Sequence, residues 1–197
     1  MCSRYENELP ASAYAERLEG IVDILDEAKH WTPPPDHRPT SETLVIYERD
    51  GRQVMGTAFW GFPLPQPGKK PKPVINARME SLQTSPFWRG VRHCLLPATA
   101  WIEWIEEAGM NIPHRLSLPS GEPFLLAGVC AVRNNSFRMA MCMQPAPPHL
   151  AFIHHRSPMV YGMDSVNTSE RIPIIESITV ARCERFPVGE IRAERTK

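Results

Sequence analysis

Short runs rich in β-branched, aromatic and other apolar residues recur between residues 43 and 181, separated by Gly, Pro and Asn. Runs of this kind, bounded by turn-forming residues, are typical of short β-strands. We therefore expect strands over residues 43–48, 53–60, 91–97, 99–106, 114–118, 123–132, 136–143 and 172–181. The first two runs flank Asp50-Gly51, a dipeptide that predicts a tight hairpin turn.

One stretch follows a helical period instead. Its apolar residues recur at helical spacing, with Glu and Lys between them: Ala15, Leu18, Val22 and Leu25. This spacing predicts a helix over residues 11–29, which the prolines 33–35 would end. A second proline-rich stretch, residues 61–73, is expected to be a loop that carries three lysines, and residues 147–152 a helical turn. The pattern predicts an α+β protein, a single domain over residues 1–197 built on a curved, mostly antiparallel sheet or barrel with few flanking helices.

The charge balance limits the classes of partner. The chain has 22 basic and 22 acidic residues, so its net charge is zero. This argues against a protein that binds a polyanion over its whole surface, but it leaves a local basic groove open. No apolar run approaches the roughly 18 residues of a membrane helix, and the first residues are polar and charged. We therefore expect a cytoplasmic protein with no membrane partner.

The five cysteines are widely spaced and form no C-x-x-C pair, which argues against a zinc finger or ribbon. Four of them are expected to be buried free thiols: Cys94, Cys130, Cys142 and Cys183. The His154-His155 pair has no acidic or cysteine partner at ligand spacing, so we expect no metal and no other cofactor.

Cys2 is the exception because of its position. Removal of Met1 would leave a free α-amine and a thiol on the same residue. The amine has a reference pKa of about 7.7–8.0, so it is partly neutral near pH 7 and can condense with an aldehyde. The thiolate would then close a five-membered thiazolidine ring. The alternative is a chance cysteine without a chemical role.

Three further stretches carry candidate chemistry. Asn76 and Arg78 share one face of an extended segment, where an amide can orient an amine and a guanidinium can hold a phosphate. Glu103 lies in a strand among aromatic and aliphatic residues, so we expect burial to raise its pKa. His154 titrates in the range that suits proton transfer, and Arg156 follows it as a second phosphate contact.

These residues fall within short motifs that stand in a fixed order: M-C-x-R at the start, W-G at residue 60, N-A-R-x-E from residue 76, C-L-x-P-A-x-x-x-x-E-W from residue 94, I-H-x-R-x-P from residue 153, and V-N at residue 166. In this order the chain resembles the SRAP family, the SOS-response-associated peptidases or abasic-site processing proteins. The resemblance spans most of the chain.

The resemblance implies a barrel-like α+β fold and a monomer that binds single-stranded DNA, crosslinks itself to abasic sites and acts at the nucleoid. It also implies self-processing that exposes Cys2. The matching catalytic positions are Cys2, Asn76, Glu103 and His154. The matching DNA contacts are Arg4, Arg78 and Arg156, and three lysines could add to this groove: Lys69, Lys70 and Lys72.

The chain departs from the family pattern at several places. Ser3 stands where the family usually has Gly, and Ser157 where it usually has Met. The segment after Trp60 lacks the tryptophan that can wedge against bases, so stacking there is not expected. The stretch between Pro158 and Val166 is shorter than in typical members, and loss of this segment is expected to weaken the core or DNA binding.

Two other function classes fit parts of the pattern. One is an N-terminal-nucleophile amidohydrolase of the glutamine amidotransferase kind, which also begins Met-Cys but has layered sheets between helices. The other is a non-catalytic nucleic-acid-binding domain in which Cys2 is inert. Glutaminase activity would favour the first, and DNA binding without a covalent adduct would favour the second.

Overall fold

The structure is a computed structural model that describes residues 2–18, 20–34, 36–167, 175 and 178–182. The first half of the chain contains β1 (Tyr5–Glu6), α1 (Ala11–Arg17), β2 (Asp23–Ile24), α2 (Asp26–Lys29), β3 (Glu42–Arg49), β4 (Arg52–Trp60), β5 (Phe62–Gln66), β6 (Lys69–Val74), β7 (Asn76–Arg78), α3 (Met79–Leu82) and the 3-10 helix η1 (Pro86–Trp88). The second half contains β8 (Arg92–Ala98), β9 (Ala100–Glu107), β10 (Met110–Ser117), β11 (Phe124–Arg133), β12 (Ser136–Pro145), β13 (Arg156–Pro158), β14 (Val160–Tyr161), the 3-10 helix η2 (Met163–Asn167) and β15 (Thr179–Arg182).

Five strands close into a barrel. Antiparallel pairs join β4 to β3, β3 to β8, β8 to β11 and β11 to β12. A short parallel contact between β12 and β4 then completes the ring, with Arg138 opposite Phe59 and Met139 opposite Trp60. The ring has no free edge along this path, so its strands have fixed neighbours on both sides.

Alternate residues of the barrel strands point inward, as the two-residue period of a strand requires. These inward residues are buried in one apolar cluster: Val45, Ala58, Trp60, Cys94, Leu96, Ala98, Phe124, Leu126, Cys130, Met139, Met141 and Met143. The same cluster includes Cys2, Tyr5 and Trp101 from outside the ring. The barrel core therefore extends to the beginning of the chain.

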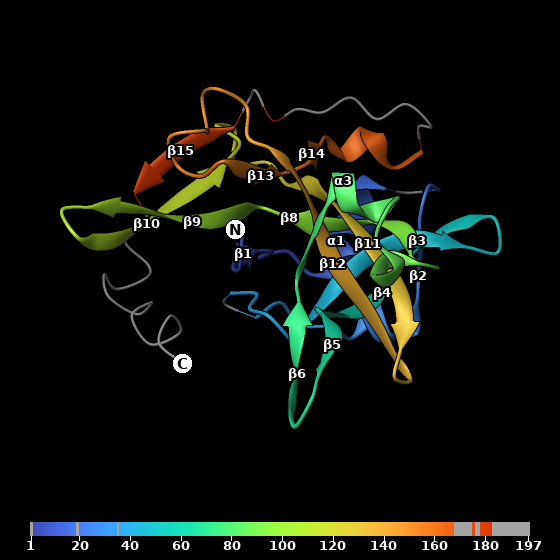
Figure 1. The fold of residues 1–197 in the computed structure, drawn as a ribbon. Coiled ribbons are helices and arrows are strands. Elements are labelled where there is room, and N and C mark those ends of the chain that lie inside the picture. Colours follow the sequence, from blue (N-terminus) through green and yellow to red (C-terminus); the bar gives the residue numbers. More distant parts are fainter. Residues whose placement is uncertain (1, 19, 35, 168–174, 176–177, 183–197) are drawn as a thin grey trace.

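A second sheet lies at one end of the barrel, with the order β1-β9-β10-β15. Thr99 interrupts the run between β8 and β9, so one nearly continuous segment passes from the barrel into the second sheet. The long β9–β10 hairpin projects from the barrel on the side where the N-terminus lies (Figure 1). This connection places Glu103, in β9, next to the N-terminal strand β1.

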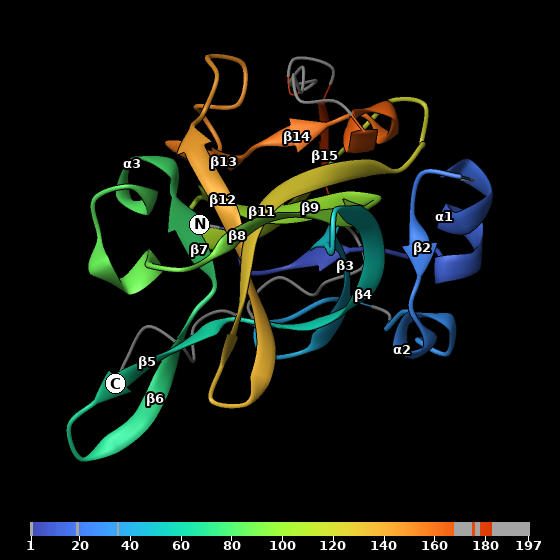
Figure 2. The same ribbon diagram turned by 90° about the vertical axis from the view of Figure 1, so that its right-hand side faces the viewer.

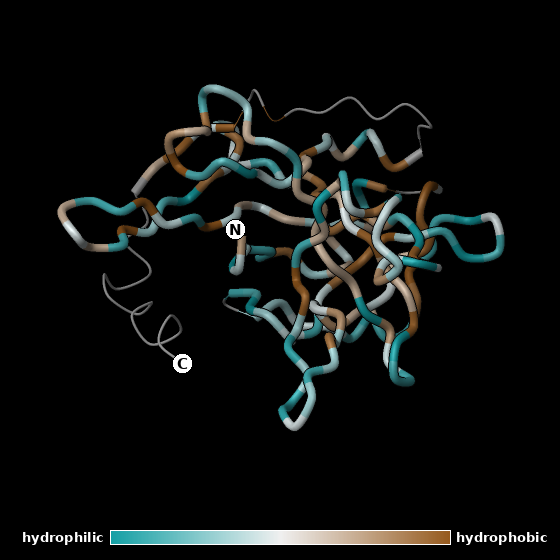
Figure 3. The backbone as a smooth tube through the Cα atoms, in the orientation of Figure 1, coloured by the Kyte–Doolittle hydropathy of each residue, from teal (hydrophilic) through white to brown (hydrophobic). Residues whose placement is uncertain are grey.

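Short helices cover two outer faces of the barrel. Helices α1 and α2 pack on one face through Tyr14, Leu18 and Ala28, whereas α3 and η1 lie on another (Figure 2). The tips of the β3–β4 and β11–β12 hairpins are hydrophilic (Figure 3). Within the described residues, no helix has the length and hydrophobicity that crossing a bilayer requires.

The predicted fold class is confirmed, because the chain is mostly strand with few helices and its sheets are curved. The Asp50-Gly51 hairpin is also confirmed, and both residues have positive φ, 53° and 74°. Hydrogen bonds from the amides of Leu150 and Ala151 to Pro147 and Pro148 form the expected turn. The predicted strand over residues 172–181 is described only in part, as β15.

The prediction of one continuous helix over residues 11–29 is wrong, although α1 and α2 both lie within this range. Helix α1 ends at Arg17, and Gly20 takes a left-handed φ of 73°, which breaks the helix. Asp23 and Ile24 then pair in parallel with β4, so the apolar period that looked helical is shared between a helix end and a strand.

The predicted loop over residues 61–73 is also wrong, because this stretch forms the β5–β6 hairpin. Prolines had argued against strands here, since they cannot donate a ladder hydrogen bond. In an isolated two-stranded ribbon half of the amides point outward, and a proline at such a position loses nothing. Pro63 and Pro73 face each other across this ribbon.

Gly128 in β11 provides a test of the barrel packing. A Cβ at this position would lie 2.5 Å from Leu96 Cδ1, 3.0 Å from the Ala140 carbonyl oxygen and 3.0 Å from Cys94 Sγ. We expect Gly128→Ala to lower the free energy of unfolding by about 1–3 kcal/mol, measured by urea denaturation. Gly121 has open space around it and serves as the control. Gly121→Ala should lower the free energy of unfolding by only ~1 kcal/mol, through its positive φ of 74°. An equal or smaller loss for Gly128→Ala would contradict this packing.

Candidate active site at the N-terminus

The N-terminal segment, residues 2–7, is held by backbone hydrogen bonds on both sides. On one side the Ile102 and Thr99 amides donate to the carbonyl oxygens of Arg4 and Glu6, at 3.0 and 2.8 Å. On the other side Tyr5 exchanges two hydrogen bonds with His37, of 3.3 and 2.9 Å. A chain terminus usually frays, but this one is bonded like an interior strand.

Asn76 fixes the position of Cys2. Its side-chain Nδ2 donates a hydrogen bond of 2.8 Å to the Cys2 carbonyl oxygen. Asn76 begins β7, which pairs in parallel with β12 so that Asn76 lies opposite Met141. As the alternation in this segment predicts, Ala77 is buried between Asn76 and the exposed Arg78. The barrel therefore positions the amide that holds the second residue of the chain.

The Cys2 thiol is fully enclosed. The residue has no exposed surface, and its Sγ donates a long hydrogen bond of 3.5 Å to the Arg4 carbonyl oxygen. Burial raises the pKa of this thiol far above its ordinary value, and the nearby negative charge of Glu103 raises it further. The sulfur is thus a protonated thiol at neutral pH. Cys94, Cys130 and Cys142 are also buried and free, as expected, whereas Cys183 lies outside the described residues.

Glu103 is the buried carboxyl of the site. Its residue is 4% exposed, and burial raises the pKa of the carboxyl to about 7. The direction agrees with the expectation from its apolar neighbours in the sequence. A carboxyl with this pKa exists in both protonation states near neutral pH, so it can accept and donate protons there.

His154 is half-buried at the end of the turn before β13. Two backbone groups of Arg156 lie within hydrogen-bond distance of the His154 Nδ1, the amide N–H at 2.9 Å and the carbonyl oxygen at 3.1 Å, so the Arg156 backbone engages Nδ1 in either tautomer. Burial lowers the pKa of His154 below its ordinary value. The imidazole is therefore mainly neutral at pH 7.

Direct interactions join three of the four candidate catalytic residues. The negative charge of Glu103 adds to burial in raising the pKa of the Cys2 thiol, so the carboxyl lies within electrostatic reach of the sulfur. Asn76 joins them through its hydrogen bond to the Cys2 carbonyl oxygen. The structure thus brings Cys2, Asn76 and Glu103 together from distant parts of the sequence, and His154 lies on the turn before β13.

The three candidate DNA-binding arginines differ in their surroundings. The Arg4 side chain is only 9% exposed, lies 3.7 Å from Asp36 Oδ2 and packs over the Trp104 ring at 5.7 Å. These contacts give Arg4 a structural role, because a buried guanidinium offers little surface to a phosphate. Arg78 is exposed at the end of β7.

Arg156 forms an ion pair instead of standing free. Its Nη1 lies 2.7 and 2.8 Å from the two carboxylate oxygens of Glu80, whose side chain is 56% exposed. The pair joins α3 to β13 across the surface beside His154. The three candidate lysines, Lys69, Lys70 and Lys72, are exposed on β6.

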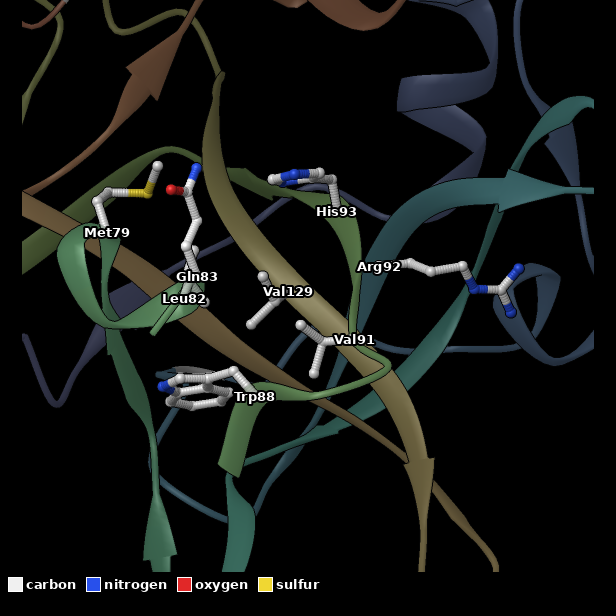
Figure 4. Close-up of a pocket in the computed structure, with 8 residues that line it drawn as sticks. All are labelled: Met79, Leu82, Gln83, Trp88, Val91, Arg92, His93 and Val129. Atoms are coloured by element: carbon white, nitrogen blue, oxygen red, sulfur yellow. The ribbon is translucent and has the colours of Figure 1, made fainter. Parts of the chain in front are cut away.

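Two pockets of the described structure lie away from the candidate site. A pocket of about 220 Å³ beside α3 is lined by residues that include Gln83, Trp88, His93 and Val129 (Figure 4). A second pocket of about 430 Å³ shares His93 and adjoins β3. None of the seven proposed site residues lines either pocket. Among the described residues, no three His, Cys, Asp or Glu side chains gather as a metal site would require.

The fold and the site define a class of protein: a small β-barrel with an enclosed cysteine near the start of the chain, beside an amide and a carboxyl. The family model of the SOS response associated peptidase (SRAP) matches residues 1–168. The chain belongs to the SRAP family. A search of curated proteins finds no match.

Solved structures share the fold at low sequence identity. A crystal structure of a protein from Bordetella bronchiseptica is 20% identical, with a TM-score of 0.72, and the match covers 93% of this chain and 100% of that one. A phage-related protein from the same organism is 18% identical, with a TM-score of 0.68 and coverage of 93% and 95%. A protein from Bacteroides thetaiotaomicron is 15% identical, with a TM-score of 0.70 and coverage of 93% for both chains.

Sequence reasoning missed two residues that support the site. Asp36 binds Arg4 in the N-terminal segment, yet it stands in a proline-rich stretch without any strand or helix pattern. Glu80 binds Arg156, and its signal was the final position of the N-A-R-x-E motif. Both contacts cross between distant segments, so spacing alone could not reveal them.

The raised pKa of Glu103 predicts a pH-dependent stability. Between about pH 4.5 and pH 7 the unfolded carboxyl loses its proton while the folded one keeps it, so the free energy of unfolding falls as pH rises. Glu103→Gln removes this dependence. We expect the variant to gain stability relative to wild type between pH 4.5 and pH 8, by roughly 3 kcal/mol at most.

Urea denaturation of both proteins at several pH values measures this difference. Glu106→Gln, which changes an exposed carboxyl in the same strand, serves as the matched control and should leave the pH dependence of wild type unchanged. Parallel curves for wild type and Glu103→Gln would show that Glu103 does not have a raised pKa.

Proposed function

We propose that this protein captures abasic sites in single-stranded DNA by forming a covalent thiazolidine through Cys2 after Met1 is removed, and that self-processing at this site releases Met1. Membership of the SRAP family supports an association with DNA and with peptidase chemistry. The observation that carries the proposal is the 2.8 Å hydrogen bond from Asn76 to the Cys2 carbonyl, which fixes the residue bearing both nucleophiles beside Glu103.

The proposed reaction begins at the amine. The Cys2 α-amine attacks the aldehyde carbon of the ring-opened sugar, and loss of one water gives an imine. The thiol then loses its proton, the sulfur adds to the imine carbon, and the nitrogen takes up a proton as the five-membered ring closes. Because the sulfur and the amine belong to one residue, imine formation brings the sugar carbon next to the thiol, with which it must come within bonding distance for the ring to close.

The surrounding side chains have separate roles in this proposal. Glu103, with a pKa of about 7, would take a proton from the ammonium and return it when water leaves, and would later pass the thiol proton to the nitrogen as the ring closes. His154 would exchange a proton with the sugar oxygen through Nε2, because the Arg156 backbone engages its Nδ1. Asn76 would hold Cys2 in a fixed position relative to Glu103 and His154. Arg78 and Arg156 would contact phosphates.

The competing functions have less support. The amidohydrolase alternative predicts layered sheets between helices, whereas the described strands form a five-stranded barrel with short helices outside it. The non-catalytic alternative offers no reason to bury a carboxyl with a pKa of about 7 beside a thiol, since this arrangement lowers stability above that pH.

Adduct formation tests the proposal directly. Protein whose intact mass shows that Met1 is absent should form a heat-stable adduct with single-stranded DNA carrying an abasic site. The adduct mass should equal the sum of the two components less one water. Cys2→Ala and a form that retains a blocked N-terminal extension should form none. The proposal fails if processed wild-type protein gives no adduct.

The rate of adduct formation at saturating DNA distinguishes a role of Glu103 and His154 in the chemistry from a role in DNA binding. Glu103→Gln and His154→Gln should slow adduct formation at saturating DNA, by about 10²–10⁴-fold if each transfers a proton in the limiting step. Their affinity for DNA with a reduced, aldehyde-free abasic site should remain within about twofold of wild type. A fall in affinity with an unchanged rate at saturation would remove Glu103 and His154 from the chemistry.

The ion pair of Arg156 with Glu80 predicts a change in DNA affinity. A phosphate that binds Arg156 must compete with the Glu80 carboxylate, so Glu80→Gln should tighten binding to single-stranded DNA at low salt. A partly exposed ion pair is worth up to ~1 kcal/mol, which corresponds to at most about fivefold. Fluorescence anisotropy with a labelled oligonucleotide measures the change.

Glu122→Gln is the matched control, because it removes the same charge from another exposed ion pair, with Arg17. Its affinity for DNA should match that of wild type. Weaker binding by Glu80→Gln would mean that Glu80 orients Arg156 for DNA and does not compete with it.

A further inference from the structure

The turn between β12 and β13 exposes an aromatic side chain next to the proposed active site. Phe152 is 65% exposed, the largest fraction among the large hydrophobic residues in the described part of the chain. It precedes His154 by two residues. Most of Phe152 is open to solvent, so a ligand that covers its ring would gain from removing apolar surface from water.

The turn that carries Phe152 is firmly held. Leu150 and Ile153, on either side of Phe152, are 2% and 8% exposed and belong to the apolar cluster of the barrel. The Ile153 and His154 amides donate to the Leu150 carbonyl oxygen at 3.0 and 3.4 Å. The phenyl ring is thus presented by a turn anchored in the core, and little conformational entropy would be lost when it binds.

Groups that suit a nucleic acid lie beside Phe152 on the same turn. The His155 ring is exposed and stacks on the His154 ring, with centroids 4.2 Å apart and planes inclined by 29°. An amide hydrogen bond of 3.0 Å from Ala146 to the His155 carbonyl closes the base of the turn. Arg156 follows directly and carries the guanidinium paired with Glu80.

We propose that Phe152 and His155 form a stacking surface for the unpaired nucleobases that flank the abasic sugar. The inference rests on the proposed function and names how the same site holds its DNA. Aromatic side chains next to cations are a general means of binding single strands, because every base has a face that can stack whatever the sequence. The outer face of His155 would extend the stack that His154 begins, and Phe152 would take a second base.

Binding to a non-reactive DNA tests this surface without any covalent step. The probe is a single-stranded oligonucleotide with a tetrahydrofuran abasic analogue flanked by 2-aminopurine, whose fluorescence falls when it stacks. Phe152→Ala should bind this DNA about tenfold more weakly and lose the fluorescence change, whereas Phe152→Trp should retain both. The midpoint of thermal unfolding of Phe152→Ala should match wild type, because the ring is exposed.

Val132→Ala is the matched control. Val132 is 62% exposed but lies at the β11–β12 hairpin, the opposite end of β12 from the turn. Its affinity and fluorescence change should equal those of wild type. Equal losses in Val132→Ala and Phe152→Ala would overturn the proposal, because the effect would then be one of general surface hydrophobicity.

The outcomes distinguish this inference from the proposed function. If wild type forms the abasic-site adduct but Phe152→Ala binds the analogue within twofold of wild type, the stacking surface is wrong and the crosslinking function stands. If wild type neither binds the DNA nor forms an adduct, both fail. A change in oligomeric state on gel filtration, with unchanged DNA affinity, would make Phe152 a contact between protein copies and overturn the stacking role.

Discussion

The whole site depends on the beginning of the chain being an interior strand. Backbone hydrogen bonds from Ile102 and Thr99 hold one edge of the N-terminal segment, and His37 holds the other. Without these bonds, Cys2 would lie in a frayed end and could keep no fixed relation to any other group. The hydrogen bond from Asn76 then ties the segment to the barrel, so the position of Cys2 is determined by strands far away in the sequence.

This placement has an electrostatic consequence. A thiol, a carboxyl and an imidazole are all removed from water to different degrees, and burial is the main cause of each shift in pKa. Buried titratable groups lower stability when they must carry charge, which the closed barrel offsets by its large apolar core. Arg4 contributes within the segment itself, where Asp36 balances its charge and Trp104 covers its guanidinium.

The surface that we propose for DNA binding differs from the enclosed site, because it depends on a few local charged and aromatic groups. With a net charge of zero, affinity for a polyanion must come from a few local groups. Arg78 is exposed, Arg156 is paired with Glu80, and Phe152 and His155 share the turn next to Arg156. Such a surface combines a weak electrostatic attraction with stacking, which suits recognition of a distorted or single strand more than recognition of a sequence.

The sequence by itself determined the strand-rich fold class, the Asp50-Gly51 hairpin and the residue types of the site, because these depend on local alternation, turn chemistry and short motifs. It misassigned residues 11–29 and 61–73, where a left-handed glycine and an isolated proline-rich ribbon override local propensity. Only the tertiary structure decided that Arg4 is buried against Asp36, that Arg156 is paired with Glu80 and that the Cys2 thiol is enclosed. These features are contacts between segments distant in the chain. Local sequence patterns do not determine which distant residue each side chain contacts.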